Sequence, residues 1–153
     1  VSGWGNDSLM GDGGANWLGG GRGLDSLVGG VGKDTLLGCV SAERGGRGEV
    51  DTLTGGDDAD LFVLGSAGVC FYDDGFSGAN GAGDFALITD FAMGVDRLQL
   101  RGRASNYYGT SVVSGVKGQG LWLEQGAQDE LIAVIQGKGT LTVGNVLAAA
   151  SYV

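Results

Sequence analysis

Large apolar residues recur at every ninth position over the first sixty residues of the chain. When the sequence is divided into nines from Ser2, the eighth position of the regular units holds Leu9, Leu18, Leu27, Leu36, Leu53 and Phe62. A unit of this length is too short for a helical hairpin, and it divides into a six-residue turn and a three-residue strand. The middle residue of such a strand points to one face of its sheet, so the pattern predicts a thin core made of these side chains.

Two successive units would form one coil with a strand on each side, and alternate units would then stack as parallel strands. The register slips at GCVSAERG, which has eight residues, and it returns in GRGEVDTLT. The sequence therefore predicts that residues 1–64 form a solenoid of nonapeptide repeats with an irregular unit at 38–50.

The nine-residue period vanishes after residue 64, and longer strand-like segments separated by glycine-rich turns take its place. Only VGNVLAAAS, close to the end of the chain, has the pattern of a short helix. Because the open end of a solenoid exposes strand edges and core side chains, we expect residues 65–153 to form an antiparallel β cap continuous with the repeats. The fold class predicted for the whole chain is all-β.

The sixth position of each regular unit carries a side-chain oxygen, from Asp7, Asn16, Asp25, Asp34, Asp51 and Asp60. The stacked pairs that we expect are Asp7 with Asp25, Asn16 with Asp34, Asp34 with Asp51, and Asp60 with the irregular unit that contains Glu43. Stacked carboxylates repel one another, and a hard cation with oxygen ligands would relieve the repulsion. Calcium accepts six to eight oxygens in flexible geometry, whereas magnesium demands a tighter octahedron. Zinc would lack imidazole ligands in this chain, which contains no histidine.

Composition narrows the function classes further. The 153 residues include 34 glycines and no proline, and the net charge is −9, which favours cations as partners and disfavours nucleic acid. No apolar run is long enough to span a membrane. The absence of histidine removes His-dependent triads and zinc-protease motifs, and Asp73 and Asp74 are adjacent, which is poor geometry for a glycosidase pair. We therefore expect no enzymatic activity.

The nonapeptides, above all GGVGKDTLL and GGRGLDSLV, resemble the RTX (repeats-in-toxin) family, whose GGxGxDxUx repeats form a calcium-binding parallel β-roll. The resemblance implies several calcium ions, held by the side chains at the sixth position that are listed above. It also implies that the sites are completed by the carbonyls of Gly3, Gly5, Gly21, Gly23, Gly30 and Gly32. Three departures weaken the match: Asn16 is neutral, and Glu49 and Asp58 replace the fourth-position glycine. We expect the sites that adjoin the irregular unit to be weakened or missing.

The segment ALITDFAMGVDRLQL also resembles the sequence that follows the repeats in many RTX proteins. The resemblance implies that Asp90 contributes to a final calcium site, and it supports Asp96 less strongly. From the residues alone, an Asp90 side chain that faces solvent remains an alternative. The glycine-rich segment 72–84 holds Asp73, Asp74 and Asp84, and we interpret it as a solvated loop rather than as another oxygen cage.

Cys39 and Cys70 both lie outside the regular repeats, and the sequence leaves open whether they form one disulfide or stay as two buried thiols.

The resemblance also implies a bacterial protein that leaves the cell through a type I channel and folds outside on binding calcium. The apolar ending LAAASYV is similar to a C-terminal secretion tail, and the first residues show no signal peptide and begin within a repeat, as expected of a fragment of a larger protein. Two other functions stay open. The chain could be a structural subunit that self-associates through open roll edges into a calcium-dependent fibre or surface layer. It could also be an adhesin or glycan-binding module that uses aromatic side chains such as Trp4 and Trp17.

Overall fold

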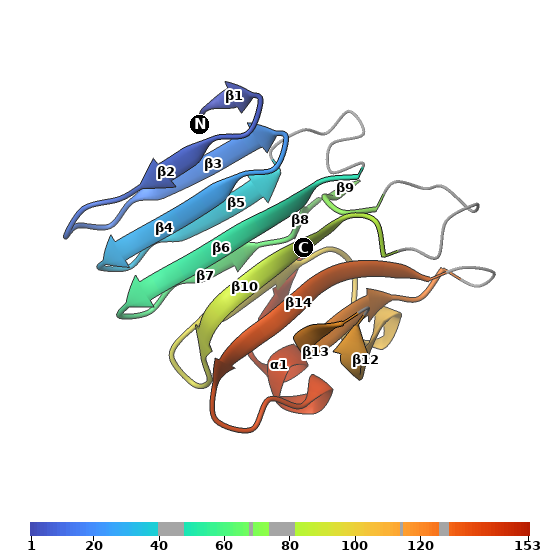
Figure 1. Cartoon of the computed structure of the whole chain (residues 1–153). Helices are drawn as coiled ribbons and strands as arrows, with labels where there is room; N and C mark the ends of the chain where they lie inside the picture. Colours follow the sequence, from blue (N-terminus) through green and yellow to red (C-terminus); the bar gives the residue numbers. More distant parts are fainter. Residues whose placement is uncertain (40–47, 68, 74–81, 114, 126–128) are drawn as a thin grey trace.

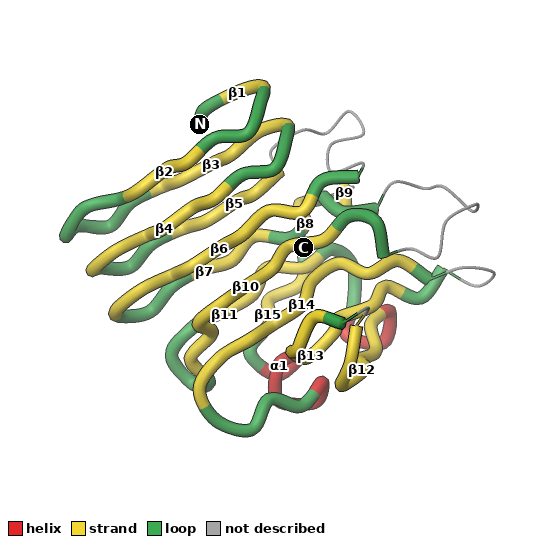
Figure 2. The backbone as a smooth tube through the Cα atoms, in the orientation of Figure 1, coloured by secondary structure: helices red, strands yellow, loops and turns green. Residues whose placement is uncertain are grey.

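The computed structural model describes residues 1–39, 48–67, 69–73, 82–113, 115–125 and 129–153, with the backbone alone at 69, 70 and 112. Within these residues the chain forms two stacked β-sheets, and its first seven strands alternate between them (Figures 1 and 2). The short turns that connect the sheets lie at the two ends of the strands.

The first sheet has six strands, and all of its pairs are parallel. In spatial order these strands are β1 (Gly3–Trp4), β3 (Trp17–Arg22), β5 (Thr35–Cys39), β7 (Leu61–Val63), β11 (Arg97–Leu100) and β15 (Ala150–Tyr152).

The second sheet has seven strands. Their order is β12 (Tyr107–Val113), β13 (Val116–Leu123), β14 (Glu130–Lys138), β10 (Phe85–Ala92), β6 (Val50–Asp57), β4 (Ser26–Val31) and β2 (Ser8–Met10). A small antiparallel pair, β8 (Gly65–Ser66) with β9 (Val69–Cys70), and a 3-10 turn at Ala104–Asn106 complete the β part. The predicted C-terminal helix is confirmed as α1 (Val143–Ala148), which the side chain of Thr142 caps.

The nine-residue period produces the core that the sequence predicts. Leu9 lies beside Leu27 on neighbouring parallel strands, and Leu18 lies beside Leu36. The eighth-position residues further along the roll, namely Leu27, Leu36, Leu53 and Phe62, are fully buried. Leu9 and Leu18 at the N-terminal edge are only partly buried because no further coil covers them among the described residues.

The register across the irregular unit differs from the expected one. Asp25 pairs with Asp51, and Asp34 pairs with Asp60, over separations of 26 residues instead of 18. The expected pairs of Asp34 with Asp51, and of Asp60 with the irregular unit, are therefore wrong. The physical reason is that the eight extra residues fall between β5 and β6 without adding a described strand, so β6 returns to the sheet that the regular repeat would have reached.

Parallel pairing continues well beyond the repeats. β10 pairs with β6 and β11 with β7, and β14 and β15 then add to these strands in parallel. Ile88 lies beside Leu53, and Leu98 beside Phe62, so both take over the core position of the repeat. The antiparallel part of the second sheet is formed by β13 and β12. The predicted class, an all-β parallel roll continuous with an antiparallel part, is confirmed. The expectation that the whole of 65–153 is antiparallel is wrong, because among the described residues β10, β11 and β15 pair only in parallel and extend the roll. A domain division at residue 64 stays a prediction.

In the part of the chain that the structure describes, no helix has both the length and the apolar character needed to cross a membrane.

Candidate metal centre

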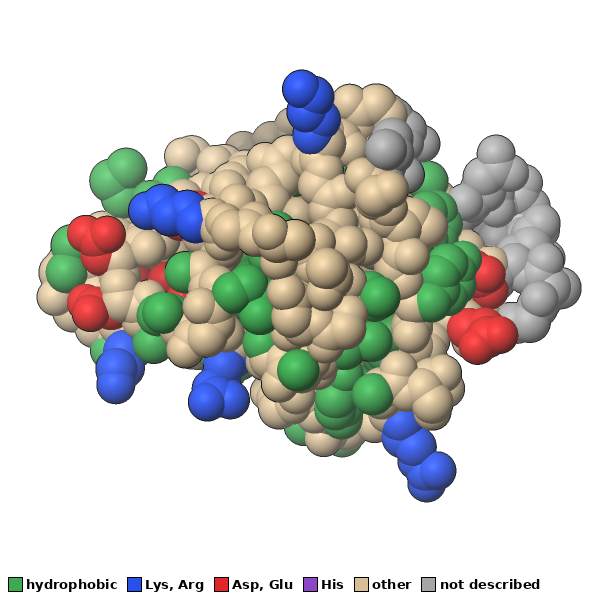
Figure 3. All heavy atoms as spheres, turned by 90° about the horizontal axis from the view of Figure 1, so that it is seen from below, with side chains coloured by type: hydrophobic (Ala, Val, Ile, Leu, Met, Phe, Trp, Pro, Cys, Tyr) green, Lys and Arg blue, Asp and Glu red, His purple; other side chains and the backbone are tan. Residues whose placement is uncertain are grey.

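The side chains at the sixth position form two stacks, one at each end of the strands. The first stack consists of Asp7, Asp25 and Asp51, and the second consists of Asn16, Asp34, Asp60 and Asp96. In each stack the backbone N–H of one member donates to the Oδ1 atom of the member in the next coil. The N–O distances lie between 2.7 and 3.0 Å. Figure 3 shows acidic side chains gathered at the end of the molecule where the turns after β2, β4 and β6 lie.

Three members of the stacks have an Oδ2 atom that is buried and accepts no hydrogen bond from the described residues. Asp25, Asp34 and Asp60 are only 2%, 1% and 2% exposed, and the Oδ2 atom of each is buried with no hydrogen-bond donor among the described residues. A buried anionic oxygen without a partner is costly, because desolvation is not compensated. A cation beside each Oδ2 atom would compensate it.

Glycine carbonyls line the same turns. Gly30 and Gly32 have φ angles of 112° and 120°, which L residues with side chains rarely adopt. A Cβ atom on Gly32 would lie 2.7 Å from the carbonyl oxygen of Gly14, and one on Gly30 would lie 2.6 Å from that of Asp12. Successive turns therefore bring backbone carbonyl oxygens close to the next coil.

The predicted glycines follow this arrangement in pairs. Gly3 lies beside Gly21 across β1 and β3, and Gly5 faces Gly23 in the adjoining turn. All six glycines that the resemblance proposes as carbonyl donors have positive φ. The structure brings them to the turns, and their role as ligands stays a prediction.

Electrostatics in the stacks is unfavourable without a cation. Burial raises the pKa of Asp51 to about 6. Burial also raises the pKa of Asp60 to about 6, and the neighbouring charges of Asp96 and Asp34 act in the same direction. The pKa of Asp25 is raised by burial and further by the charge of Asp7, and burial raises the pKa of Asp96. These carboxylates are therefore held where their charged form is disfavoured.

Two members of the stacks, Asp51 and Asp96, and the nearby Asp90 have both carboxylate oxygens in hydrogen bonds. The Oδ2 atom of Asp51 accepts a hydrogen bond from the hydroxyl of Tyr72 at 2.7 Å, and that of Asp96 accepts one from the N–H of Ala92 at 2.7 Å. Asp90 is half-buried, and its two oxygens accept from the N–H groups of Gly55 and Gly56 at 3.0 and 2.9 Å. Asp90 thus connects its own strand to the turn of the preceding coil by hydrogen bonds. Its role as a calcium ligand stays a prediction.

Asn16 is also engaged within its own turn. Its Oδ1 atom accepts from the N–H of Asp12 at 2.9 Å, and its Nδ2 group donates to the Oδ1 atom of Asp12 at 3.1 Å. The neutral amide of Asn16 therefore shares its turn with the carboxylate of Asp12, which the nine-residue pattern alone did not single out.

Asp96 is the member of the stacks that the repeat pattern supports least. Its signal is the spacing to the core residue Leu98, which equals the spacing from Asp60 to Phe62. The signal is weak because the residues between Asp60 and Asp96 do not follow the nonapeptide pattern, although their separation of 36 residues is four times nine.

The donor set fits calcium. The described residues contain no cluster of three or more Asp, Glu, Cys or His side chains, so a metal site here has to combine few carboxylate oxygens with backbone carbonyls. Calcium accepts that mixture of oxygens, whereas structural zinc requires thiolate or imidazole ligands.

Two further predictions concern residues near the turns. Cys39 is buried, but the side chain of Cys70 lies outside the described residues, so a disulfide stays a prediction. Most of the segment 72–84, including Asp74, also lies outside them. Asp84 at its end is buried, which the solvated-loop interpretation did not anticipate.

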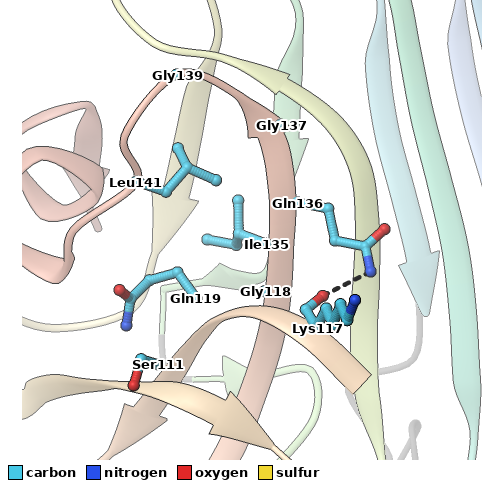
Figure 4. Close-up of a pocket in the computed structure, with 9 residues that line it drawn as sticks. All are labelled: Ser111, Lys117, Gly118, Gln119, Ile135, Gln136, Gly137, Gly139 and Leu141. Carbon is cyan, nitrogen blue, oxygen red and sulfur yellow. Dashed lines mark hydrogen bonds between the residues drawn. The ribbon is translucent and has the colours of Figure 1, made fainter. Parts of the chain in front are cut away.

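A hollow of about 550 Å³ lies away from the stacks, on β12, β13, β14 and the turn after β14 (Figure 4). Its lining includes Lys117, Gln119, Gln136 and Leu141, and the side-chain amide of Gln136 donates to the carbonyl of Lys117 at 2.6 Å. Its lining among the described residues has a cationic side chain and no carboxylate, so the hollow does not extend the acidic turns.

Comparisons with known proteins agree with this geometry. A family model described as RTX calcium-binding nonapeptide repeat (4 copies) matches residues 1–36 and 45–67. Among solved structures, the chain is similar to the solution structure of the AlgE6R3 subunit from the Azotobacter vinelandii mannuronan C5-epimerase. The two are 25% identical with a TM-score of 0.53, and the match covers 100% of this chain and 80% of that one. A comparison with curated proteins gives no match.

Proposed function

This chain carries RTX calcium-binding nonapeptide repeats in a parallel β-roll, and from that premise we propose that it is a non-catalytic extracellular module that folds when it binds calcium. The observation that carries the proposal is the set of buried Oδ2 atoms of Asp25, Asp34 and Asp60, which have no donor among the described residues. These carboxylates oppose folding in the absence of a cation and favour it in its presence.

The proposed ligands follow from the same contacts. Asp25, Asp34 and Asp60 would hold calcium through Oδ2, together with carbonyls of the turn glycines. Asp7 and Asn16 lie at the N-terminal edge, where the described chain supplies only one neighbouring coil. A bound calcium ion would supply the positive charge that compensates the buried carboxylates. The ligand residues would hold the ion in place and shield it from water.

The free energy of binding then decides when the chain folds. Extracellular calcium modules typically bind with dissociation constants of about 10⁻⁴ to 10⁻³ M. A ligand at a hundred times its dissociation constant stabilises the folded state by about 2.7 kcal/mol per site. Several such sites are comparable to the whole stability of a small domain, which is about 5–15 kcal/mol. The module would therefore stay unfolded where calcium is scarce and fold outside the cell, as secretion through a type I channel requires.

Similarity to a repeat subunit supports the non-catalytic role. The AlgE6R3 subunit comes from an epimerase, and the part of that protein which this chain resembles is named as a subunit of it. We propose that this chain likewise supplies a calcium-dependent scaffold rather than the reacting groups.

Self-association is a second candidate function, which the N-terminal edge favours. Each of β1 and β2 has a strand partner on one side only in the described structure, and Trp4 and Met10 on them are 85% and 79% exposed. Strand addition by another copy would cover this edge. Sedimentation in calcium over a range of protein concentrations tests this candidate, which a chain that stays monomeric throughout would exclude.

Circular dichroism of the chain with chelator, with calcium and with equal magnesium tests the main proposal. We expect a β spectrum that is lost on chelation and restored by calcium but not by magnesium. A full β spectrum at vanishing calcium would overturn it.

A further inference from the structure

Four carboxylates occupy the same position of the repeat at the same depth. Asp25, Asp34, Asp51 and Asp60 are each 1–2% exposed, and the Oδ1 atom of each accepts a backbone N–H from the preceding coil. Among the described residues, only Asp51 of these four has a donor on its Oδ2 atom, and that donor is the hydroxyl of Tyr72.

The four Oδ2 atoms also have equivalent surroundings. In the turns of Asp25, Asp34 and Asp60, Oδ2 is the nearest atom to the place where a Cβ atom would stand on the glycine that opens the turn, namely Gly20, Gly29 and Gly55. The Oδ2 atom of Asp51 lies close to the same place on Gly38, and the hydroxyl of Tyr72 lies close to both. We propose that this hydroxyl takes the place of a calcium ion at the turn of Asp51, so that the first stack ends there in a metal-free closure. The inference rests on the proposed function, because it says which equivalent carboxylate does not bind the metal.

The fold holds the hydroxyl in this position. Tyr72 is fully buried, and its ring belongs to the same core cluster as Leu36 and Leu53. The backbone just before it is tied to the roll by a hydrogen bond from the N–H of Phe71 to the carbonyl of Leu64 at 3.2 Å. A cation at the Oδ2 atom of Asp51 would have to displace a hydroxyl that the core packing fixes. A bond from a hydroxyl to a carboxylate is charge-assisted, so the closure satisfies the anion well.

Glu49 supplies an independent second contact. It stands at the fourth position of its unit, where the regular repeats have glycine, and its Oε1 atom accepts from the N–H of Gly23 at 3.0 Å. The turn before Asp51 is therefore joined to the preceding turn of the first stack by a side chain of this chain. The hydrogen bonds of Tyr72 to Asp51 and of Gly23 to Glu49 both end on the unit that follows the irregular GCVSAERG.

Two isosteric substitutions separate the alternatives. Asp34→Asn and Asp51→Asn remove the charge from carboxylates of equal burial whose Oδ1 atoms make the same backbone bond. Bound calcium per chain would be measured by elemental analysis after dialysis at saturating calcium. We expect Asp34→Asn to lose one ion and Asp51→Asn to lose none. Loss of an ion from Asp51→Asn, in a chain that otherwise binds calcium, would overturn this inference alone. A wild-type chain without bound calcium would overturn the proposed function and this inference with it.

Tyr72→Phe covers the case in which Asp51→Asn fails to fold. It keeps the ring in the core and removes only the donor to Asp51, and Tyr107→Phe is the matched control. Tyr107 is also buried, and its hydroxyl donates to the carbonyl of Arg101 at 2.8 Å, far from the stacks in sequence. We expect Tyr72→Phe to raise the calcium concentration at half-folding by a larger factor than the control. Equal factors in the two variants would contradict the closure.

Discussion

The backbone N–H of Asp60 donates to the Oδ1 atom of Asp96 at 3.0 Å, although 36 residues separate them. This bond repeats the contact between Asp34 and Asp60 one coil earlier. The second stack therefore continues beyond residue 67, where the match to the nonapeptide repeats ends.

Removing the carboxylate of Asp96 is predicted to destabilise the roll although it lies outside the matched repeats. Asp96→Ala takes the acceptors from the N–H groups of Asp60 and Ala92 in a buried turn. Unsatisfied buried donors cost about 1–3 kcal/mol each. Urea unfolding at saturating calcium should therefore show that the free energy of unfolding falls by an amount in that range or above. Asp129→Ala is the control, because Asp129 also accepts two hydrogen bonds but lies nearer the surface. A loss no greater than that of the control would show that the contact contributes little.

A methyl group on Gly32 is predicted to disrupt the close approach of two turns. Gly32→Ala forces an L residue to a φ of 120° and places its Cβ atom 2.7 Å from the carbonyl oxygen of Gly14. Strain of this kind costs about 1–3 kcal/mol, and the calcium needed for half-folding should rise with it. Gly13→Ala is the control, because a Cβ atom there meets nothing within 4 Å. Matching calcium titrations for the two variants would refute the close packing of these turns.

The metal-free chain is predicted to gain stability as the pH falls from about 6 towards 4. Burial raises the pKa of Asp51 and of Asp60 to about 6 from the ordinary value of 3.8. Between these values the folded chain holds protons that the unfolded chain has released, so lowering the pH favours folding, and the gain is lost as the pH rises through 6. Because the metal-free chain is expected to be mostly unfolded near neutral pH, circular dichroism of protein freed of metal on a chelating resin, followed from pH 7 to pH 4, measures how much β structure returns. Stability that rises with pH across the same window would contradict the assignment.

The sequence predicted the roll and its core because the nine-residue period is local. Each turn and strand is encoded within one unit, and the positions of Leu27 and Leu36 follow from counting. The same counting placed Asp25 and Asp34 in the turns where the structure has them.

The rest of the site depends on contacts that no period encodes. The partners of Asp51 and Asp60 differ from the expected ones because β6 follows β5 in the opposite sheet, despite the extra residues between them. The repeat pattern could not predict this order, because it is decided by how the sheets pack. The hydrogen bond of Tyr72 to Asp51 joins a core ring to a turn 21 residues away, and its sequence carries no sign of the pairing.

Anomalous scattering from crystals grown in calcium tests the central claim most directly. The account predicts ions about 2.3–2.6 Å from the Oδ2 atoms of Asp25, Asp34 and Asp60, with backbone carbonyls as further ligands. A map in which these three oxygens contact only water or protein would contradict it.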